Sequence, residues 1–148
     1  MFGPVTISTQ IEISASPATV RSAFLDFARV KKCTGWSIGV KGSNQQPAEL
    51  TKGDRLRVDL GGLAFSPNVL HNEPELFIWD GNIPGIISGK HHFYFSPSET
   101  NPGGTTFIQK EDFTGILTLF WPRASTKAWS NEKWNAFNEA LKKEVEQS

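Results

Sequence analysis

The sequence is poor in the features that mark several large classes of protein. Its 148 residues contain one cysteine, Cys33, so no internal disulfide can form, and no Asn-x-Ser/Thr glycosylation acceptor occurs. The 15 basic and 15 acidic residues balance, so charge favours neither nucleic acid nor an anionic membrane as a partner. No apolar run reaches the roughly 18 residues of a membrane span, and the N-terminus has no basic region followed by an apolar core, so we expect no signal peptide. These absences predict a cytoplasmic protein with no stable membrane association.

Patterns that bind metals or phosphates are missing as well. No Cys or His pair has the spacing of zinc ligands, and the neighbours His91 and His92 would face opposite sides of a strand. The pairs Gly61-Gly62 and Gly103-Gly104 lack the following lysine and helix that a phosphate loop requires. The sequence places no base beside Cys33, so we interpret it as a small buried or half-buried residue rather than a nucleophile. We therefore expect neither a metal nor a cofactor.

Large aromatic side chains, in contrast, are abundant, with eleven Phe and five Trp against a single Tyr. Such rings line protein cores and apolar cavities alike, so their number does not distinguish a packed interior from a hollow one. Their positions are more informative, because many of them recur at the spacing of a helix face or of a strand face.

The C-terminal stretch from Ser130 to Glu146 has the pattern of one long amphipathic helix. Its apolar stripe consists of residues at intervals of three and four: Trp134, Phe137, Leu141 and Val145. Trp129 falls on another face. Ser130 can act as the N-cap, although the helix could begin as early as Pro122. Everything upstream of about Thr114 has the pattern of strands, turns and short helices, so the helix must cover a sheet.

The chain begins with one strand and two short helices. Residues Val5 to Ser14 alternate, with apolar side chains on one face. Ser16-Pro17 then predicts an N-cap followed by a proline in the first turn of a helix that ends near Ala28. A second short turn includes Val30 to Cys33, and Gly35 ends it.

Six further strands follow, separated by turn-rich loops. Their predicted ranges are Trp36–Lys41, Arg55–Leu60, Leu63–Val69, Leu76–Asp80, Gly89–Ser96 and Thr105–Phe113. Pro67 marks an edge or a bulge in the third of them. Consecutive strands joined by short loops pair antiparallel, and a long twisted sheet curls. We therefore predict an α+β fold in one domain, residues 1–148, with a curved antiparallel sheet of about seven strands wrapped around the C-terminal helix.

Several segments, taken together and in order, resemble a known superfamily. They are IEISASPATVRSAFLDFARVKKCTGW, LFIWDGN, GKHHFYFSP, GGTTFIQKEDFTG and WNAFNEALKK. They resemble the bacterial and fungal branch of the superfamily that contains polyketide cyclases, START lipid-transfer domains and the major pollen allergens, the SRPBCC or START-like proteins. The resemblance covers nearly the whole chain and implies the helix-grip fold, in which the sheet grips the last helix around an apolar cavity. It says little about chemistry, because carriers, sensors, cyclases and hydrolases share the scaffold.

The resemblance also implies a binding site in that cavity, built from the inward faces of the strands and of the last helix. The expected ligand contacts are Trp79, His91, Phe93, Phe95, Phe107, Gln109, Glu111, Phe113, Trp134, Phe137 and Leu141. His91 and Glu111 lie on neighbouring predicted strands. Counting outward from the loop between these strands places Phe95 opposite Thr105 or Thr106. His91 then comes close to Gln109, within one register step of Glu111.

Three functions fit this sequence. We expect the binding of a hydrophobic or amphipathic small molecule in the cavity rather than catalysis, with His91 and Glu111 either anchoring a polar group of the ligand or satisfying each other as a buried pair. A polyketide cyclase-like or hydrolase-like enzyme would use the same two residues for proton transfer. The remaining alternative is a non-catalytic domain that acts through a dimer or a partner surface. The protein would be a monomer or a homodimer.

One end of the predicted sheet carries unusually apolar loops. The turns at Gly61-Gly62, Gly81–Ser88 and Gly115–Pro122 fall at the same end of an antiparallel meander. This end carries Leu60, Leu63, Ile83, Pro84, Ile86, Ile87, Ile116, Leu117, Phe120 and Trp121. Loops normally avoid so much apolar side chain, because they face water. They would therefore form either a lid over a cavity mouth, with Gly81, Gly85 and Gly89 as hinges, or a patch that docks a partner or a second copy of the chain.

Overall fold

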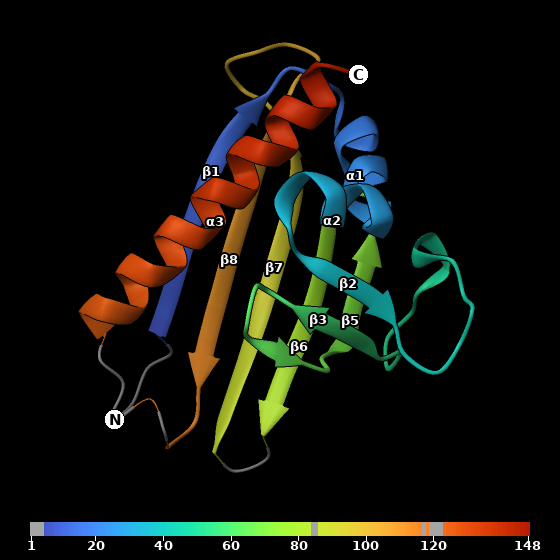
Figure 1. Ribbon diagram of the computed structural model, residues 1–148. Helices are drawn as coiled ribbons and strands as arrows, with labels where there is room; N and C mark the ends of the chain where they lie inside the picture. Colours follow the sequence, from blue (N-terminus) through green and yellow to red (C-terminus); the bar gives the residue numbers. More distant parts are fainter. Residues whose placement is uncertain (1–4, 84–85, 117, 119–122) are drawn as a thin grey trace.

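The computed structural model describes residues 5–83, 86–116, 118 and 123–148 of the chain. Its elements are, in order, β1 (Val5–Ile13), α1 (Pro17–Leu25), α2 (Phe27–Thr34), β2 (Ser37–Val40), the 3-10 turn η1 (Pro47–Glu49), β3 (Leu56–Asp59), β4 (Ala64–Phe65), β5 (Asn68–Glu73), β6 (Leu76–Ile83), β7 (Ile87–Pro97), β8 (Thr105–Thr114) and α3 (Arg123–Glu146). Figure 1 shows α3 lying across one face of a curved sheet, with α1 and α2 beside it and the short strands β2 and β3 crossing the same face.

The strands form two antiparallel sheets rather than one. Five strands pair in the order β1-β8-β7-β6-β5, and three pair in the order β2-β3-β4. The single strand predicted over Leu63–Val69 is divided at Pro67 into β4, which pairs with β3, and β5, which pairs with β6. Proline has no N–H to donate, so ladder pairing stops there. Its carbonyl still accepts from the Leu56 N–H at 2.9 Å, which keeps the two sheets side by side.

Helix α3 confirms the predicted stripe, and of the two predicted starts it agrees with the earlier one, near Pro122. Trp134, Phe137, Leu141 and Val145 are all buried. The helix begins at Arg123, so Ser130 is not its N-cap: it lies inside the helix and is only 2% exposed. None of the helices in the described ranges combines the length and the apolar character needed to cross a membrane.

The first helix, α1, ends at Leu25 rather than near the predicted Ala28, and α2 already begins at Phe27. The predicted cap at Ser16 and the end of α2 at Gly35 are confirmed. The Ser16 side chain accepts from the Thr19 N–H at 3.2 Å, and Pro17 occupies the first turn of α1. Asp26 caps α2 by accepting from the Arg29 N–H at 3.2 Å, which gives this carboxylate a structural role. Gly35 closes α2 with a φ of 84°, a left-handed conformation that favours glycine.

Aromatic rings fill the space between the sheet and the helices. Phe24 of α1 is fully buried at the centre, with its ring centroid 4.5 Å from that of Phe93 on β7 and 6.4 Å from that of Phe137 on α3. Phe77 and Phe95 each lie 5.6 Å from the same ring. At this end of the molecule the interior is therefore closely packed.

The carboxylate of Glu12, on β1, makes the stability of the fold depend on pH. Glu12 of β1 accepts hydrogen bonds from the Ser98 and Thr106 hydroxyls, which lower the pKa of its carboxyl below the ordinary 4.5. A lowered folded-state pKa adds stability above about pH 4.5, and this contribution is lost as the pH falls through the lowered value.

Glu12→Gln should therefore lower the free energy of unfolding at pH 7, and its difference from the wild type should shrink towards pH 3. Urea denaturation at both pH values measures this, with Glu99→Gln in the adjoining exposed loop as the control. A difference that persists unchanged at pH 3 would contradict the assignment.

Candidate functional site

Three side chains lie in one row across the middle strands of the large sheet. The register pairs Trp79 of β6 with His91 of β7, and His91 in turn with Glu111 of β8. Side chains of directly paired residues lie on the same face of a sheet. The predicted proximity of His91 and Glu111 is confirmed, whereas the predicted register is shifted, because Phe95 pairs with Phe107.

A continuous chain of hydrogen bonds runs from this row into the helix. One oxygen of Glu111, Oε1, lies 3.0 Å from His91 Nδ1, and His91 Nε2 lies 2.8 Å from Gln109 Oε1. Gln109 Nε2 donates to Asn138 Oδ1 at 2.7 Å. The Asn138 amide then donates to Thr9 Oγ1 at 3.1 Å, which ties α3 to β1. Every link between His91 and Thr9 is buried.

The direction of this chain fixes where its protons lie. The Trp134 carbonyl, which can only accept, is 3.5 Å from Gln109 Nε2, so the amide nitrogen belongs on that side and Oε1 faces His91. His91 Nε2 therefore carries a proton and donates it to Gln109. The other ring nitrogen faces a carboxylate oxygen at 3.0 Å, and two bare acceptors do not approach so closely. The contact between His91 and Glu111 must hold a proton.

Aromatic rings enclose the His91 imidazole on its remaining sides. It stacks on Phe93, with centroids 4.3 Å apart and planes 5° from parallel. Its other ring neighbours are Trp134 at 4.8 Å, Trp79 at 5.4 Å and Trp36 at 6.3 Å. The His91 side chain is 1% exposed and that of Glu111 is 15% exposed. The polar chain therefore reaches the outside through Glu111.

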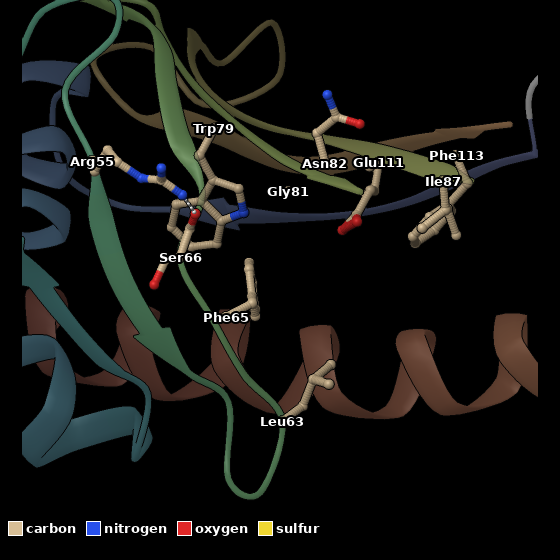
Figure 2. Close-up of a pocket in the computed structure, with 11 residues that line it drawn as sticks. Arg55, Leu63, Phe65, Ser66, Trp79, Gly81, Asn82, Ile87, Glu111 and Phe113 are labelled. Carbon is tan, nitrogen blue, oxygen red and sulfur yellow. Dashed lines mark hydrogen bonds between the residues drawn. The ribbon is translucent and has the colours of Figure 1, made fainter. Parts of the chain in front are cut away.

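A pocket of about 440 Å³ adjoins Glu111. Its lining residues are Arg55, Leu63, Phe65, Ser66, Trp79, Gly81, Asn82, Ile87, Gly89, Glu111 and Phe113. Figure 2 shows the Glu111 carboxylate pointing from the sheet into this space, whereas the Asn82 side chain points the other way. The side chains of Trp79, Phe65 and Phe113 form aromatic walls around the carboxylate. The pocket is thus mainly apolar with one acidic group inside.

Two glycines face each other on the inner side of the sheet at the pocket. Gly81 of β6 pairs with Gly89 of β7, one row beyond Trp79 and His91. Because neither has a side chain, other side chains approach the sheet closely there, and a Cβ on Gly81 would lie 3.4 Å from the Phe65 ring. A Cβ on Gly89 would lie 3.0 Å from Glu111 Oε2 and 3.3 Å from the Phe113 ring, so these two groups occupy the space above it. Glycine inside a strand often marks such a close approach.

The structure divides the predicted ligand contacts into two groups. Trp79, Glu111 and Phe113 line the pocket. The remaining contacts are buried in the adjoining core and are absent from the pocket lining: His91, Phe93, Phe95, Phe107, Gln109, Trp134, Phe137 and Leu141. As ligand contacts, all eleven residues remain predictions. Arg55, Leu63, Phe65 and the paired glycines line the pocket but were not among the predicted contacts.

The apolar end of the sheet lies at this pocket. Leu63 lines it and is 51% exposed, while Ile86 and Ile116 are 45% and 61% exposed. The predicted hinges Gly81 and Gly89 lie within paired strands, while Gly85 is outside the described residues. Also outside them are Pro84, Leu117, Phe120 and Trp121, together with the Ile83 side chain. The lid and the docking patch therefore both remain predictions.

The chain has one thiol, that of Cys33. Cys33 is half-buried, its Sγ lies 3.7 Å from the Val30 carbonyl, and burial raises the pKa of its thiol. A raised pKa keeps the thiol protonated and disfavours a nucleophile. Within residues 5–83, 86–116, 118 and 123–148, no group of three His, Cys, Asp or Glu side chains is placed to hold a metal ion.

Comparison with known proteins identifies the fold. No protein-family model matches the sequence, and no curated protein matches it. A START superfamily protein from Mycobacterium smegmatis is similar in structure, with a TM-score of 0.70 at 20% identity over 98% of this chain and 99% of that one. The Zhui aromatase/cyclase from Streptomyces sp. R1128 has a TM-score of 0.66 at 13% identity over 96% and 93% of the chains. Ara h 8.0201 has a TM-score of 0.66 at 13% identity over 99% and 100%.

These likenesses extend over nearly the full length of each chain, so they concern the whole architecture rather than a shared motif. The chain has the helix-grip fold: a curved antiparallel sheet around a long C-terminal helix. The resemblance noted in the sequence is confirmed at this level. At these identities the likeness establishes the fold alone.

Proposed function

We propose that the protein binds a hydrophobic or amphipathic small molecule in the pocket above Gly81 and Gly89. The observation that carries this proposal is the pocket itself, about 440 Å³ with aromatic walls and a single inward carboxylate. Small-molecule sites typically measure roughly 300–1,000 Å³ and combine apolar walls with a few polar groups. The inward side chains of β6, β7 and β8 supply those walls, and the exposed Leu63 lies at the rim.

The arrangement of the polar groups favours binding over catalysis. From His91 to Thr9 each buried polar group has a partner, as expected for a network that holds β8, α3 and β1 together. Only Glu111 faces the pocket among the members of this chain. We further infer that residues 1–148 act as one domain, without a cofactor, in the cytoplasm, and as a monomer or homodimer.

A second function is favoured by one specific contact. The proton held between His91 Nδ1 and Glu111 Oε1 lies one carboxylate away from the pocket, so Glu111 could exchange it with a bound substrate. Such an enzyme would resemble cyclases or hydrolases, and the Zhui aromatase/cyclase has the same fold. The two functions separate in Glu111→Gln. An enzyme would keep its affinity and lose turnover, whereas a carrier would only bind less tightly.

The proposed function is tested by filling the pocket with one methyl group. Gly89→Ala places a Cβ 3.0 Å from Glu111 Oε2, so we expect its affinity for the neutral dye Nile red to fall several-fold while the fold is retained. Gly39→Ala is the matched control, because it adds a Cβ to a strand glycine with nothing within 4 Å. Fluorescence titration measures both, and native mass spectrometry of the purified protein looks for a retained small molecule. A wild type that neither binds Nile red nor retains a small molecule would refute this function.

A further inference from the structure

Two polar groups on the pocket wall, one half-buried and one buried, have no hydrogen-bond partner among the residues that the structure describes. The first is Glu111 Oε2, the oxygen that lies above Gly89. Its sister oxygen, Oε1, contacts His91, but Oε2 makes no hydrogen bond to any residue that the structure describes. The Glu111 side chain is 15% exposed and lines the pocket, so a ligand there can reach Oε2.

The second group is the indole N–H of Trp79. This side chain is 99% buried by its neighbours, since only 1% of it is exposed, and its N–H has no hydrogen-bond acceptor in the described part of the chain. Figure 2 shows the indole nitrogen and the Glu111 carboxylate on two sides of the same space, with Gly81 between them. The indole N–H groups of Trp36 and Trp134 also lack a described acceptor, but neither residue lines the pocket.

The hydrogen-bonding character of Glu111 Oε2 does not depend on where the shared proton sits. If the proton is on His91, Glu111 is a carboxylate and Oε2 accepts. If the proton is on Oε1, Oε2 is a carbonyl oxygen and still accepts. The indole N–H can only donate. The pocket therefore offers one fixed acceptor and one fixed donor, both from the same face of the large sheet.

We propose that the ligand of this pocket carries a neutral hydroxyl head group, a phenol or an alcohol, that donates to Glu111 Oε2 and accepts from the Trp79 N–H. This inference rests on the proposed binding function and specifies its ligand class. A hydroxyl is the smallest group that both donates and accepts, so it is the simplest head group that can pair with both. The apolar body of the ligand then lies over the glycine pair, between Phe65 and Phe113.

Charged head groups fit less well. A carboxylate head group has no proton to donate to Glu111 Oε2. Its negative charge would also be repelled by the acidic Glu111. An ammonium can pair with Glu111, but it offers donors alone and would leave the Trp79 N–H without an acceptor. The one cation among the described residues of the pocket lining, Arg55, donates to the Ser66 carbonyl at 3.1 Å. Of the three head groups, only the hydroxyl pairs with both Glu111 Oε2 and the Trp79 N–H.

The test uses four probes with one ring system: 2-naphthol, naphthalene, 2-naphthoate and 2-naphthylmethylammonium. Equilibrium dialysis at pH 7 gives the affinity of the wild type for each. We expect 2-naphthol to bind roughly 10- to 100-fold more tightly than naphthalene, as a hydrogen bond to a charged group contributes. The naphthoate and the ammonium should both bind more weakly than 2-naphthol.

Two variants assign the preference to its residues. Trp79→Phe keeps a ring but removes the donor, and Glu111→Gln keeps the size but replaces the acidic acceptor. Each should lower the naphthol-to-naphthalene affinity ratio by about tenfold. Because both affinities are measured on the same sample, a partial loss of folded protein cancels from this ratio. Asp112→Asn is the control, since Asp112 is the next residue of β8 on the opposite face and bonds to Thr6 there.

Each outcome of these measurements either supports or overturns the hydroxyl head group. Equal binding of naphthalene and 2-naphthol, or tightest binding of the naphthoate or the ammonium, overturns the hydroxyl head group and leaves the binding function intact. The same holds if none of the four probes binds while Nile red does. If Nile red also fails to bind and no small molecule is retained, the binding function fails and the head-group inference fails with it.

Discussion

Replacement of Phe137 by alanine is expected to lower the free energy of unfolding by about 3–5 kcal/mol, the range for a large aromatic side chain removed from a packed core. Phe137 of α3 is 1% exposed. Its ring centroid lies 4.3 Å from that of Trp36, 6.2 Å from that of Phe107 and 6.4 Å from that of Phe24. These neighbours belong to α1, to β8 and to the connection between α2 and β2, so the void left by the truncation cannot close by a shift of one of them.

Chemical denaturation measures this loss, with Trp129→Ala as the matched control. Trp129 lies on the same helix but is 43% exposed, so its truncation should change the free energy of unfolding by less than about 0.5 kcal/mol. If Phe137 instead bordered a hollow, no new void would form and the loss would be markedly smaller. A loss of similar size in both variants would mean that the buried face of α3 is assigned wrongly.

The parts of this fold that the sequence predicted are those with an uninterrupted period. The inward faces of β1, β7, β8 and the apolar stripe of α3 were predicted because buried positions recur every two residues in a strand and every three to four in a helix. The start of α3 was left open between Ser130 and Pro122, since residues 123–129 precede the stripe and carry no such period. The register of β7 with β8 was shifted because register depends on the exact length of the connecting loop.

The candidate site was only partly predictable, because most of it is assembled from residues distant in sequence. Phe65 reaches Gly81 only because Pro67 divides one predicted strand between two sheets. Asn138 was missed although it lies four residues after Trp134 and three before Leu141, on the predicted stripe. A polar residue at such a position signals a buried partner. Its partner, Gln109, is 29 residues away, and no local pattern connects the two.

The polar chain through Gln109 should be the most sensitive part of the interior to the loss of a single polar group. Gln109→Leu keeps the volume of the side chain but leaves the His91 Nε2–H and Asn138 Oδ1 without partners. Each unpaired buried group costs about 1–3 kcal/mol, so the free energy of unfolding should fall by about 2–6 kcal/mol. Gln10→Leu is the control, because Gln10 is exposed on β1 and the chemical change is identical.

A double-mutant cycle isolates the link between the sheet and the helix. Asn138→Leu alone should also destabilise the protein, because Gln109 Nε2 loses its acceptor at 2.7 Å and Thr9 Oγ1 loses its donor at 3.1 Å. When both amides are replaced, neither leaves the other unpaired, and two apolar side chains meet instead. The double variant should therefore be less destabilised than the sum of the single variants, by about 0.5–3 kcal/mol. Additive losses would mean that Gln109 and Asn138 do not bond to each other, and the direction of the proton chain derived from that bond would then lose its basis.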